Sequence, residues 1–349
     1  MRVNNFVGQG VLLFIDQILI AATNWIFWLI ISKFTHVSEI GQATVIYSLV
    51  LLFSTISQLG LEYPLLKKSV SHRSSILISA LVVETIITIV LIPVLYYIGS
   101  TNAYHALASS YTWITIGLFV FTSIGFVARF ALLGISDARS ILIWDIIGTA
   151  SKFILGFALV FIGLGAFGIL LSFLFYSLVI TIATLSLSIK KFGITKYNEI
   201  HWHSDTFLQL IREAFINTPA KFSRILILSL SVVLLGFFGA SDAGIGVFYM
   251  TMMISIVIAS LASSISYTVI PASSLAKSDL TEGSLRIVLS LTSPLITALA
   301  VAPVYILSML GPVKESCFIS LIINHPPDLH QSPLRLGLAG YVCQRKSAG

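Results

Sequence analysis

The sequence predicts an all-α integral membrane protein, a polytopic helical bundle of about nine spans. Hydrophobic residues make up 57% of the chain and charged residues only 10%, whereas soluble domains carry about 25% charged residues. Apolar runs long enough to cross a bilayer recur along most of the chain, and Lys and Arg gather in alternate loops. Alternating basic loops are typical of membrane topology, so we expect no large water-exposed domain.

Each predicted span begins and ends where an apolar run meets charged or turn residues. The first run is too long for the apolar region of a signal peptide and no small-residue cleavage site follows it, so it predicts a spanning helix. Only Gly163-Leu164-Gly165-Ala166 separates the fifth span from the sixth, which predicts an antiparallel hairpin. The seventh span is short, and a start nearer Pro219 would lengthen it. The predicted spans are Val11–Ile31, Ile40–Leu61, Ile76–Ile98, Tyr111–Phe130, Ile141–Phe161, Phe167–Leu187, Ile225–Phe238, Ile245–Ile270 and Ile287–Leu310.

The distribution of basic residues predicts the orientation of the chain. Lys33 alone falls in the loops of one side, and the loop of residues 99–110 has no charge. Basic residues concentrate in cytoplasmic loops, so we predict a multi-pass protein of the plasma or inner cell membrane with a cytoplasmic N-terminus. The net charge of +6 therefore reflects topology, and we expect membrane lipids but no nucleic acid as partners. The other side receives fourteen basic residues: Arg2, Lys67, Lys68, Arg73, Arg129, Arg139, Lys190, Lys191, Lys196, Arg212, Lys221, Arg224, Lys277 and Arg286.

A long cytoplasmic loop divides the chain into two unequal lobes. We predict a six-helix transmembrane lobe over residues 1–188, an inter-lobe loop over 189–224 and a partial second lobe of three helices over 225–310. Ser38-Glu39-Ile40-Gly41 precedes the second span, and the similar Ser241-Asp242-Ala243-Gly244 precedes the eighth. Parallel repeats related by an axis along the membrane normal recur in transporters, so this pattern predicts two lobes of the same orientation.

Residues 311–349 form a tail of different character. They contain three prolines after Pro312 and both cysteines, Cys317 and Cys343, and their longest apolar run, Phe318–Ile323, is too short to cross a bilayer. Two interpretations remain open: a truncated or frame-shifted product whose tail is not native to its family, or a genuine disordered tail. Two cysteines in this position indicate neither a disulfide framework nor a metal site.

Apart from Arg129, at the very end of the fourth predicted span, four charged side chains fall inside predicted spans, where each costs about 2.5–3.5 kcal/mol on insertion scales. They are Asp16, Glu84, Asp145 and Lys152. Asp145 and Lys152 are almost two helical turns apart, so we expect them on one side of the same helix and about 10 Å apart along it. Lys152 has two interpretations. It is either a cation of a hydrated cavity that attracts the pyrophosphate of a lipid-linked sugar, or a lysine that pairs with one of the three acids.

The other candidates also have alternatives. Asp16, Glu84 and Asp145 lie near the entries of their spans, where they reach the interface, pair with lysine, or bind a coupling H⁺ or Na⁺. Arg129 and Arg139 have two interpretations. They are either basic residues of the kind that membrane topology alone predicts at a cytoplasmic end, or they attract an anionic substrate from the inner leaflet. Asn24 in the first span is more typical of a hydrogen bond between helices than of a ligand contact.

Signatures of enzymes and cofactors are absent from the sequence. His201-Trp202-His203 with Asp205 matches no strong zinc spacing, so we predict no metal site. We find no glycine-rich phosphate loop, nucleophile elbow or HExxH pattern. The loops are too short for an ATPase or glycosyltransferase domain. We therefore expect neither enzymatic activity nor a cofactor.

Four segments resemble the polysaccharide-flippase branch of the multidrug/oligosaccharidyl-lipid/polysaccharide exporter superfamily, which is MATE-like. They are residues 131–168, which include Gly163-Leu164-Gly165, together with Phe237–Tyr249, Tyr267–Ser274 and Phe34–Gly41. The resemblance extends over roughly residues 5–312. It implies at least twelve helices in two six-helix lobes that face each other across a central cavity. Relative to that pattern, this chain has the first lobe and half of the second.

The resemblance implies a transporter that flips a lipid-linked oligosaccharide, a polysaccharide repeat unit on polyprenyl pyrophosphate such as an O-antigen unit of lipopolysaccharide, by alternating access. The alternatives are a drug or cation antiporter of the same superfamily, an inactive truncated fragment, and a membrane glycan polymerase, which the small and uncharged external loops disfavour. The candidate substrate-cavity residues are Lys152, Asp145, Asp16, Glu84 and Arg129.

Overall fold

The chain folds as an all-α bundle in which six helices are long and apolar enough to cross a membrane, counted over the part of the chain that the structure describes. This result confirms the predicted fold class. The candidate spans agree with the first six predicted spans to within a few residues at each end. The computed structural model describes residues 3–69, 73–100, 109–194, 204–225, 229–250 and 252–253, with positions 286, 289, 290 and 293.

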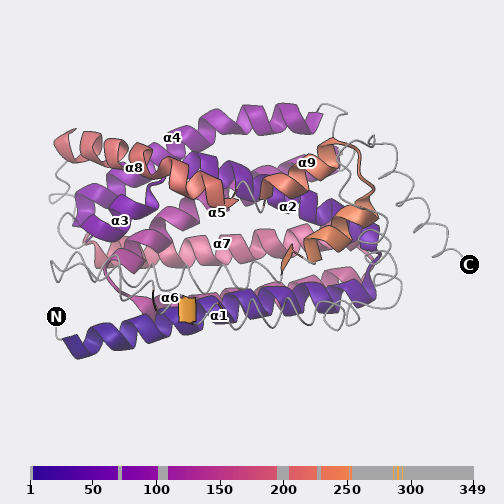
Figure 1. Cartoon of the computed structure of the whole chain (residues 1–349), viewed down its shortest axis with the longest axis horizontal. Helices are drawn as coiled ribbons and strands as arrows, with labels where there is room; N and C mark the ends of the chain where they lie inside the picture. Colours follow the sequence, from indigo (N-terminus) through magenta and orange to yellow (C-terminus); the bar gives the residue numbers. More distant parts are fainter. Residues whose placement is uncertain are drawn as a thin grey trace, which may run out of the picture.

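The spanning helices lie side by side along the long axis of the molecule (Figure 1). Helix α7 runs through the middle and packs against α2, α5 and α6, whereas α1 packs on α6, and α4 packs on α2 and α5. Short α3 follows α2, and α7 is followed by α8, α9 and the helical residues 242–250. The helices are α1 (Val3–Phe34), α2 (Val37–Gln58), α3 (Glu62–Lys68), α4 (Arg73–Ser100), α5 (Ser109–Gly134), α6 (Ala138–Phe161), α7 (Gly165–Lys191), α8 (Ser204–Ile225) and α9 (Ser231–Phe237).

Two apolar clusters fill the interior of the bundle, one toward each end. The first includes Phe27, Ile40 and Phe173 and lies toward the end where α1 stops and α2 begins. The second includes Leu65 and Val127 and lies toward the end where α2 stops and α4 begins. The buried charged residues Asp16 of α1 and Asp145 and Lys152 of α6 lie between residues of these two clusters along their helices.

The predicted hairpin between the fifth and sixth spans is confirmed. Helix α6 ends at Phe161 and α7 begins at Gly165, and the two helices pack along each other. Gly163 has φ +92°, a conformation that glycine adopts without the steric cost that a Cβ atom brings. The carboxylate of Glu39, in the first turn of α2, lies directly against Gly165 and leaves no room for a Cβ there. The hairpin is therefore closed by its own turn and held by α2.

The predicted inter-lobe loop contains a helix that sequence analysis did not identify. Helix α8 packs Leu210 and Ala214 toward α3 and α4, whereas Phe215 and Ile216 are exposed. Lys68 of α3 forms an ion pair with Glu213 at 2.7 Å. Helix α8 is amphipathic and too polar to stand out as a long apolar run, so a search for membrane spans did not identify it. The predicted seventh span falls partly on α9 and partly outside the described residues. Most of the eighth and ninth spans, and the whole tail of residues 311–349, also lie outside them.

The two segments that sequence analysis paired as a repeat lie against each other. Residues 242–250 are helical, and they meet the start of α2 at the right-hand end of the bundle in Figure 1. The side chain of Gln42 donates to Asp242 Oδ2 at 3.0 Å. A Cβ at Gly41 would overlap the carbonyl of Asp242, and a Cβ at Gly246 would lie 2.6 Å from the carbonyl oxygen of Val37. Small residues therefore allow two backbones to touch here.

We predict that Gly41→Leu separates these two segments. The reporter is a pair of cysteines, Gln42→Cys with Asp242→Cys, in a chain whose native cysteines are replaced by serine. A short bis-methanethiosulfonate should cross-link this pair in membranes, and Gly41→Leu should reduce the yield several-fold because its side chain has no space beside Asp242.

Gly244→Leu is the matched control, because a Cβ at Gly244 meets only the Ser241 hydroxyl at 3.1 Å. Equal cross-linking yields in the Gly41 and Gly244 variants would show that the close approach of the two backbones is not needed for this contact.

Candidate functional site

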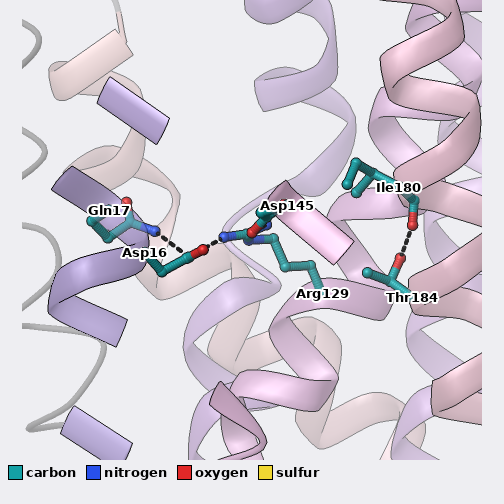
Figure 2. Close-up of polar contacts among 6 residues, drawn as sticks. All are labelled: Asp16, Gln17, Arg129, Asp145, Ile180 and Thr184. Carbon is teal, nitrogen blue, oxygen red and sulfur yellow. Dashed lines mark hydrogen bonds and ion pairs between the residues drawn. The ribbon is translucent and has the colours of Figure 1, made fainter. Parts of the chain in front are cut away.

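Three buried charged side chains from three helices form one ionic group. Arg129 of α5 donates through Nη2 to Asp16 Oδ2 of α1 at 2.8 Å, and through Nη1 to Asp145 Oδ2 of α6. Asp16 and Asp145 have essentially no exposed surface, and the Arg129 side chain is only 11% exposed. Figure 2 shows the guanidinium between the two carboxylates, with Gln17 on the far side of Asp16. We call Asp16, Arg129 and Asp145 the ionic triad.

The spacing of residues along α6 places Asp145 on the buried face of the helix, where it meets Arg129. The buried residues of this helix recur every three or four positions and define a single face, which carries both Asp145 and Lys152. Two glycines on the same face allow neighbouring helices to come close. A Cβ at Gly148 would lie 2.7 Å from Ile180 of α7, and a Cβ at Gly156 would lie 2.6 Å from the ring of Phe27 of α1.

The ionic triad has acceptor capacity that its own members do not use. Asp16 Oδ1 and Asp145 Oδ1 are buried and receive no hydrogen bond from the protein atoms described. Two carboxylates against one guanidinium leave a formal charge of minus one when all three groups are ionised. A buried charge without compensation is costly, so this group is suited to attract a cation or a proton.

Lys152 lies further along the same face of α6 and has a different environment. Its ammonium donates to Asn24 Oδ1 at 3.1 Å, and four aromatic rings surround it. Asn24 in turn donates to the sulfur of Met253 at 3.6 Å, so one amide joins α6 to a residue beyond α9. The ion pairs found among the described residues do not include Lys152.

Glu84 belongs to a separate polar cluster between α2, α4 and α5. Its Oε1 accepts a hydrogen bond from the hydroxyl of Ser57 at 2.6 Å. That hydroxyl lies 3.2 Å from the hydroxyl of Ser123, which donates to Ser54 at 3.2 Å. Glu84 is completely buried. One serine hydroxyl therefore binds this carboxylate and two further serines extend the cluster, which is distinct from the ionic triad.

The structure brings three of the five candidate residues together and leaves two apart. Asp145 and Lys152 face the interior on one side of α6, as their spacing predicts. Their partners differ from the pairing considered in the sequence, because Asp16 and Asp145 bind Arg129 and Lys152 binds Asn24. Arg129 lies inside the span Tyr111–Gly134 and not in a flanking loop, whereas Arg139 is exposed.

Sequence reasoning missed the aromatic and hydroxyl partners of these charges. In the sequence, the aromatic partners of Lys152 are indistinguishable from the other aromatic residues of the spans. Only the structure shows that they share a position around its ammonium; they are Phe27, Phe153, Phe173 and Tyr176. Serines that recur inside an apolar helix were the available signal for the Glu84 cluster. His201 and His203 lie outside the described residues, and no group of three metal-ligating side chains occurs within those residues.

The comparisons with known proteins identify a fold. No family model matches the chain, and no curated protein matches it. The solved structure of the MATE multidrug transporter DinF-BH is similar, with a TM-score of 0.61 and 15% sequence identity. The match covers 95% of this chain and 77% of that chain. At this identity the similarity establishes the MATE fold for the chain.

We predict that Arg129→Leu destabilises the protein by about 3–5 kcal/mol, because it leaves two buried carboxylates without their cation. Unfolding of the purified protein in mixed micelles measures the effect. Replacing all three members together, with Arg129→Leu, Asp16→Asn and Asp145→Asn, should recover most of the loss because no buried charge remains.

Arg139→Leu removes an exposed arginine nearby and should change stability by less than about 0.5 kcal/mol. If the triple variant is no more stable than Arg129→Leu alone, the ionic triad does not determine the stability of this region.

Proposed function

We propose that this chain is a membrane carrier that moves a lipid-linked oligosaccharide, a glycan on polyprenyl pyrophosphate, across the membrane by alternating access. The observation that carries the proposal is that two basic side chains, the buried Lys152 and the largely buried Arg129, lie inside an apolar six-span bundle of the MATE fold. Basic residues inside a membrane bundle are rare and mark substrate or ion pathways. A pyrophosphate cargo requires such positive charge.

The contact between the start of α2 and residues 242–250 is where the two proposed lobes meet. It includes close backbone packing at two glycines and a side-chain hydrogen bond from Gln42 to Asp242. Opening would also withdraw the buried Tyr249 from the first apolar cluster, where it packs on Trp28. In the proposed cycle the two lobes part at this end after the cargo has entered from the other end.

The ionic triad supports coupling of transport to an ion. Its formal negative charge and its two carboxylate oxygens without hydrogen bonds, Asp16 Oδ1 and Asp145 Oδ1, offer hard oxygen ligands for Na⁺ or a site for H⁺. In the proposed coupling, cation binding weakens the hold of the carboxylates on Arg129. The guanidinium then becomes available to the anionic cargo.

A second candidate function is drug or cation antiport on the same architecture. Two observations favour it. The similar solved structure is that of a multidrug transporter, and the ionic triad has an excess of negative charge. The two candidates differ in the charge of the cargo, so transport assays separate them.

We predict that the full chain restores surface glycan in cells that make a lipid-linked repeat unit but lack its flippase. Lys152→Ala and Arg129→Leu should each lower surface glycan at least ten-fold at equal abundance in the membrane, because the proposed cargo loses a cation in each. Arg139→Leu is the matched control, since this arginine is exposed at the start of α6.

Loss of glycan in the Arg139 control as well would remove the assignment of Arg129 and Lys152 to the cargo path. Failure of the parent chain to restore glycan, with efflux of organic cations in its place, would favour the antiporter. No transport by a stably inserted chain would favour an inactive fragment.

We predict that Asp145→Asn abolishes the dependence of transport on the coupling ion. In proteoliposomes with an imposed Na⁺ or H⁺ gradient, the parent chain should move cargo faster with the gradient than without it. The variant should give one rate in both conditions, because a neutral amide attracts no cation. A gradient response that survives in Asp145→Asn and in Asp16→Asn would exclude the triad as the ion site.

A further inference from the structure

The ammonium of Lys152 lies inside a cage of aromatic rings from α1, α6 and α7. The distances from Nζ to the ring centroids are 5.0 Å for Phe27, 5.1 Å for Phe173, 5.5 Å for Tyr176 and 5.8 Å for Phe153. Lys152 is only 4% exposed. The side-chain carbonyl of Asn24 supplies the hydrogen-bond acceptor. We call the four rings the aromatic cage.

This environment is that of a bound organic cation. A cation within about 6 Å of a ring centroid is attracted by the negative face of the ring, and cages of such rings recognise quaternary ammonium ligands. A lysine buried in a membrane bundle would ordinarily need a carboxylate. The nearby carboxylates Asp16 and Asp145 bind Arg129 instead, so the rings and one amide oxygen stabilise the ammonium.

We propose that the aromatic cage is an organic-cation site that the chain fills with its own Lys152 side chain. Lys152 acts as a tethered ligand, and the occupied cage excludes free organic cations from the interior of the lobe. The class of ligand that fits the cage is a small quaternary or alkylammonium ion. This inference does not rest on the glycan cargo proposed above, because it concerns binding to the lobe and not the cargo that is moved.

The walls of the cage hold their positions through contacts with one another. Phe27 packs edge-to-face on Phe153 and on Phe173, with ring centroids 5.4 and 5.5 Å apart. Tyr47 of α2 packs on Phe173 at 4.4 Å, which fixes the cage from the side of α2. Because these contacts do not involve Lys152, the cage should persist when that side chain is shortened.

The size and position of the cage also fit a small free cation. Truncation of Lys152 to alanine removes the side chain from Cγ to Nζ, which leaves space close to that of tetramethylammonium. Cavities made by truncation in packed interiors persist and bind ligands of matching shape. Met253, which follows residues 242–250, contacts Asn24 at the cage, so a residue from beyond α9 lies against the cage.

The test is equilibrium binding of radiolabelled tetramethylammonium to the purified full chain in lipid nanodiscs. Lys152→Ala and Lys152→Ser empty the cage, whereas Lys152→Met keeps it filled with a side chain of similar length and no charge. We expect saturable binding to the two emptied variants at least ten-fold tighter than to the parent chain or to Lys152→Met. Phe27→Leu added to Lys152→Ala should weaken binding about five-fold, because it removes one ring face.

Several outcomes would overturn the proposal. The parent chain or Lys152→Met could bind as tightly as Lys152→Ala, or a folded Lys152→Ala and a folded Lys152→Ser could both fail to bind. Competition by tert-butanol, a neutral molecule of similar size, as strong as that by unlabelled tetramethylammonium would also exclude a cation site. Monodisperse elution and an unchanged melting temperature establish folding, and the serine variant replaces the alanine variant if the latter fails.

Binding is measured without transport, so the result is independent of the glycan assay. If Lys152→Ala binds tetramethylammonium but the parent chain restores no glycan, the cage proposal stands and the glycan cargo is wrong. If the parent chain restores glycan but the emptied cage binds no tetramethylammonium, the glycan cargo stands and the cage proposal is wrong.

Discussion

The bridge that Arg129 forms between Asp16 and Asp145 is the interaction on which the interior of the lobe depends. It joins α1, α5 and α6, and α1 and α6 meet again further along at the hydrogen bond from Lys152 to Asn24. Between helices in lipid there is little hydrophobic driving force, so packing and polar contacts determine the register. An ionic group whose members meet in only one arrangement therefore specifies how α1 lies on α6, and with it the position of every residue further along that interface.

Lys152 is one of the residues whose position follows from that register. It lies on the same face of α6 as Asp145, so once Arg129 has paired with Asp145, Lys152 is held beside Asn24 and Phe27 of α1. The two cations of the lobe are consequently stabilised in different ways. Arg129 is planar and multidentate and bridges two carboxylates, whereas the compact ammonium of Lys152 fits among ring faces.

The fold was more predictable from the sequence than the site. Six apolar runs bounded by charges were sufficient for six spans, since membrane insertion depends on hydropathy summed over about twenty residues. Helix α8 was missed because it is amphipathic and contains no long apolar run, which was the pattern used to find spans. In the site, helical spacing placed Asp145 and Lys152 on one face, but no spacing within a helix reveals a partner on another helix. Arg129 was counted with the loops because it lies near the end of its span, and the four rings around Lys152 were indistinguishable from other apolar residues.

The arrangement of charge within the lobe determines which sign of cargo the proposed carrier would favour. The ionic triad has an excess of negative charge, and the ring faces of the aromatic cage attract cations. Without Lys152, both sites would therefore favour a cation. The ammonium of Lys152 occupies the cage and balances the formal charge of the triad. A single lysine at this position of α6 thus makes these four charges cancel, and in the proposed carrier a cation bound to the triad would leave an excess of positive charge for an anionic cargo.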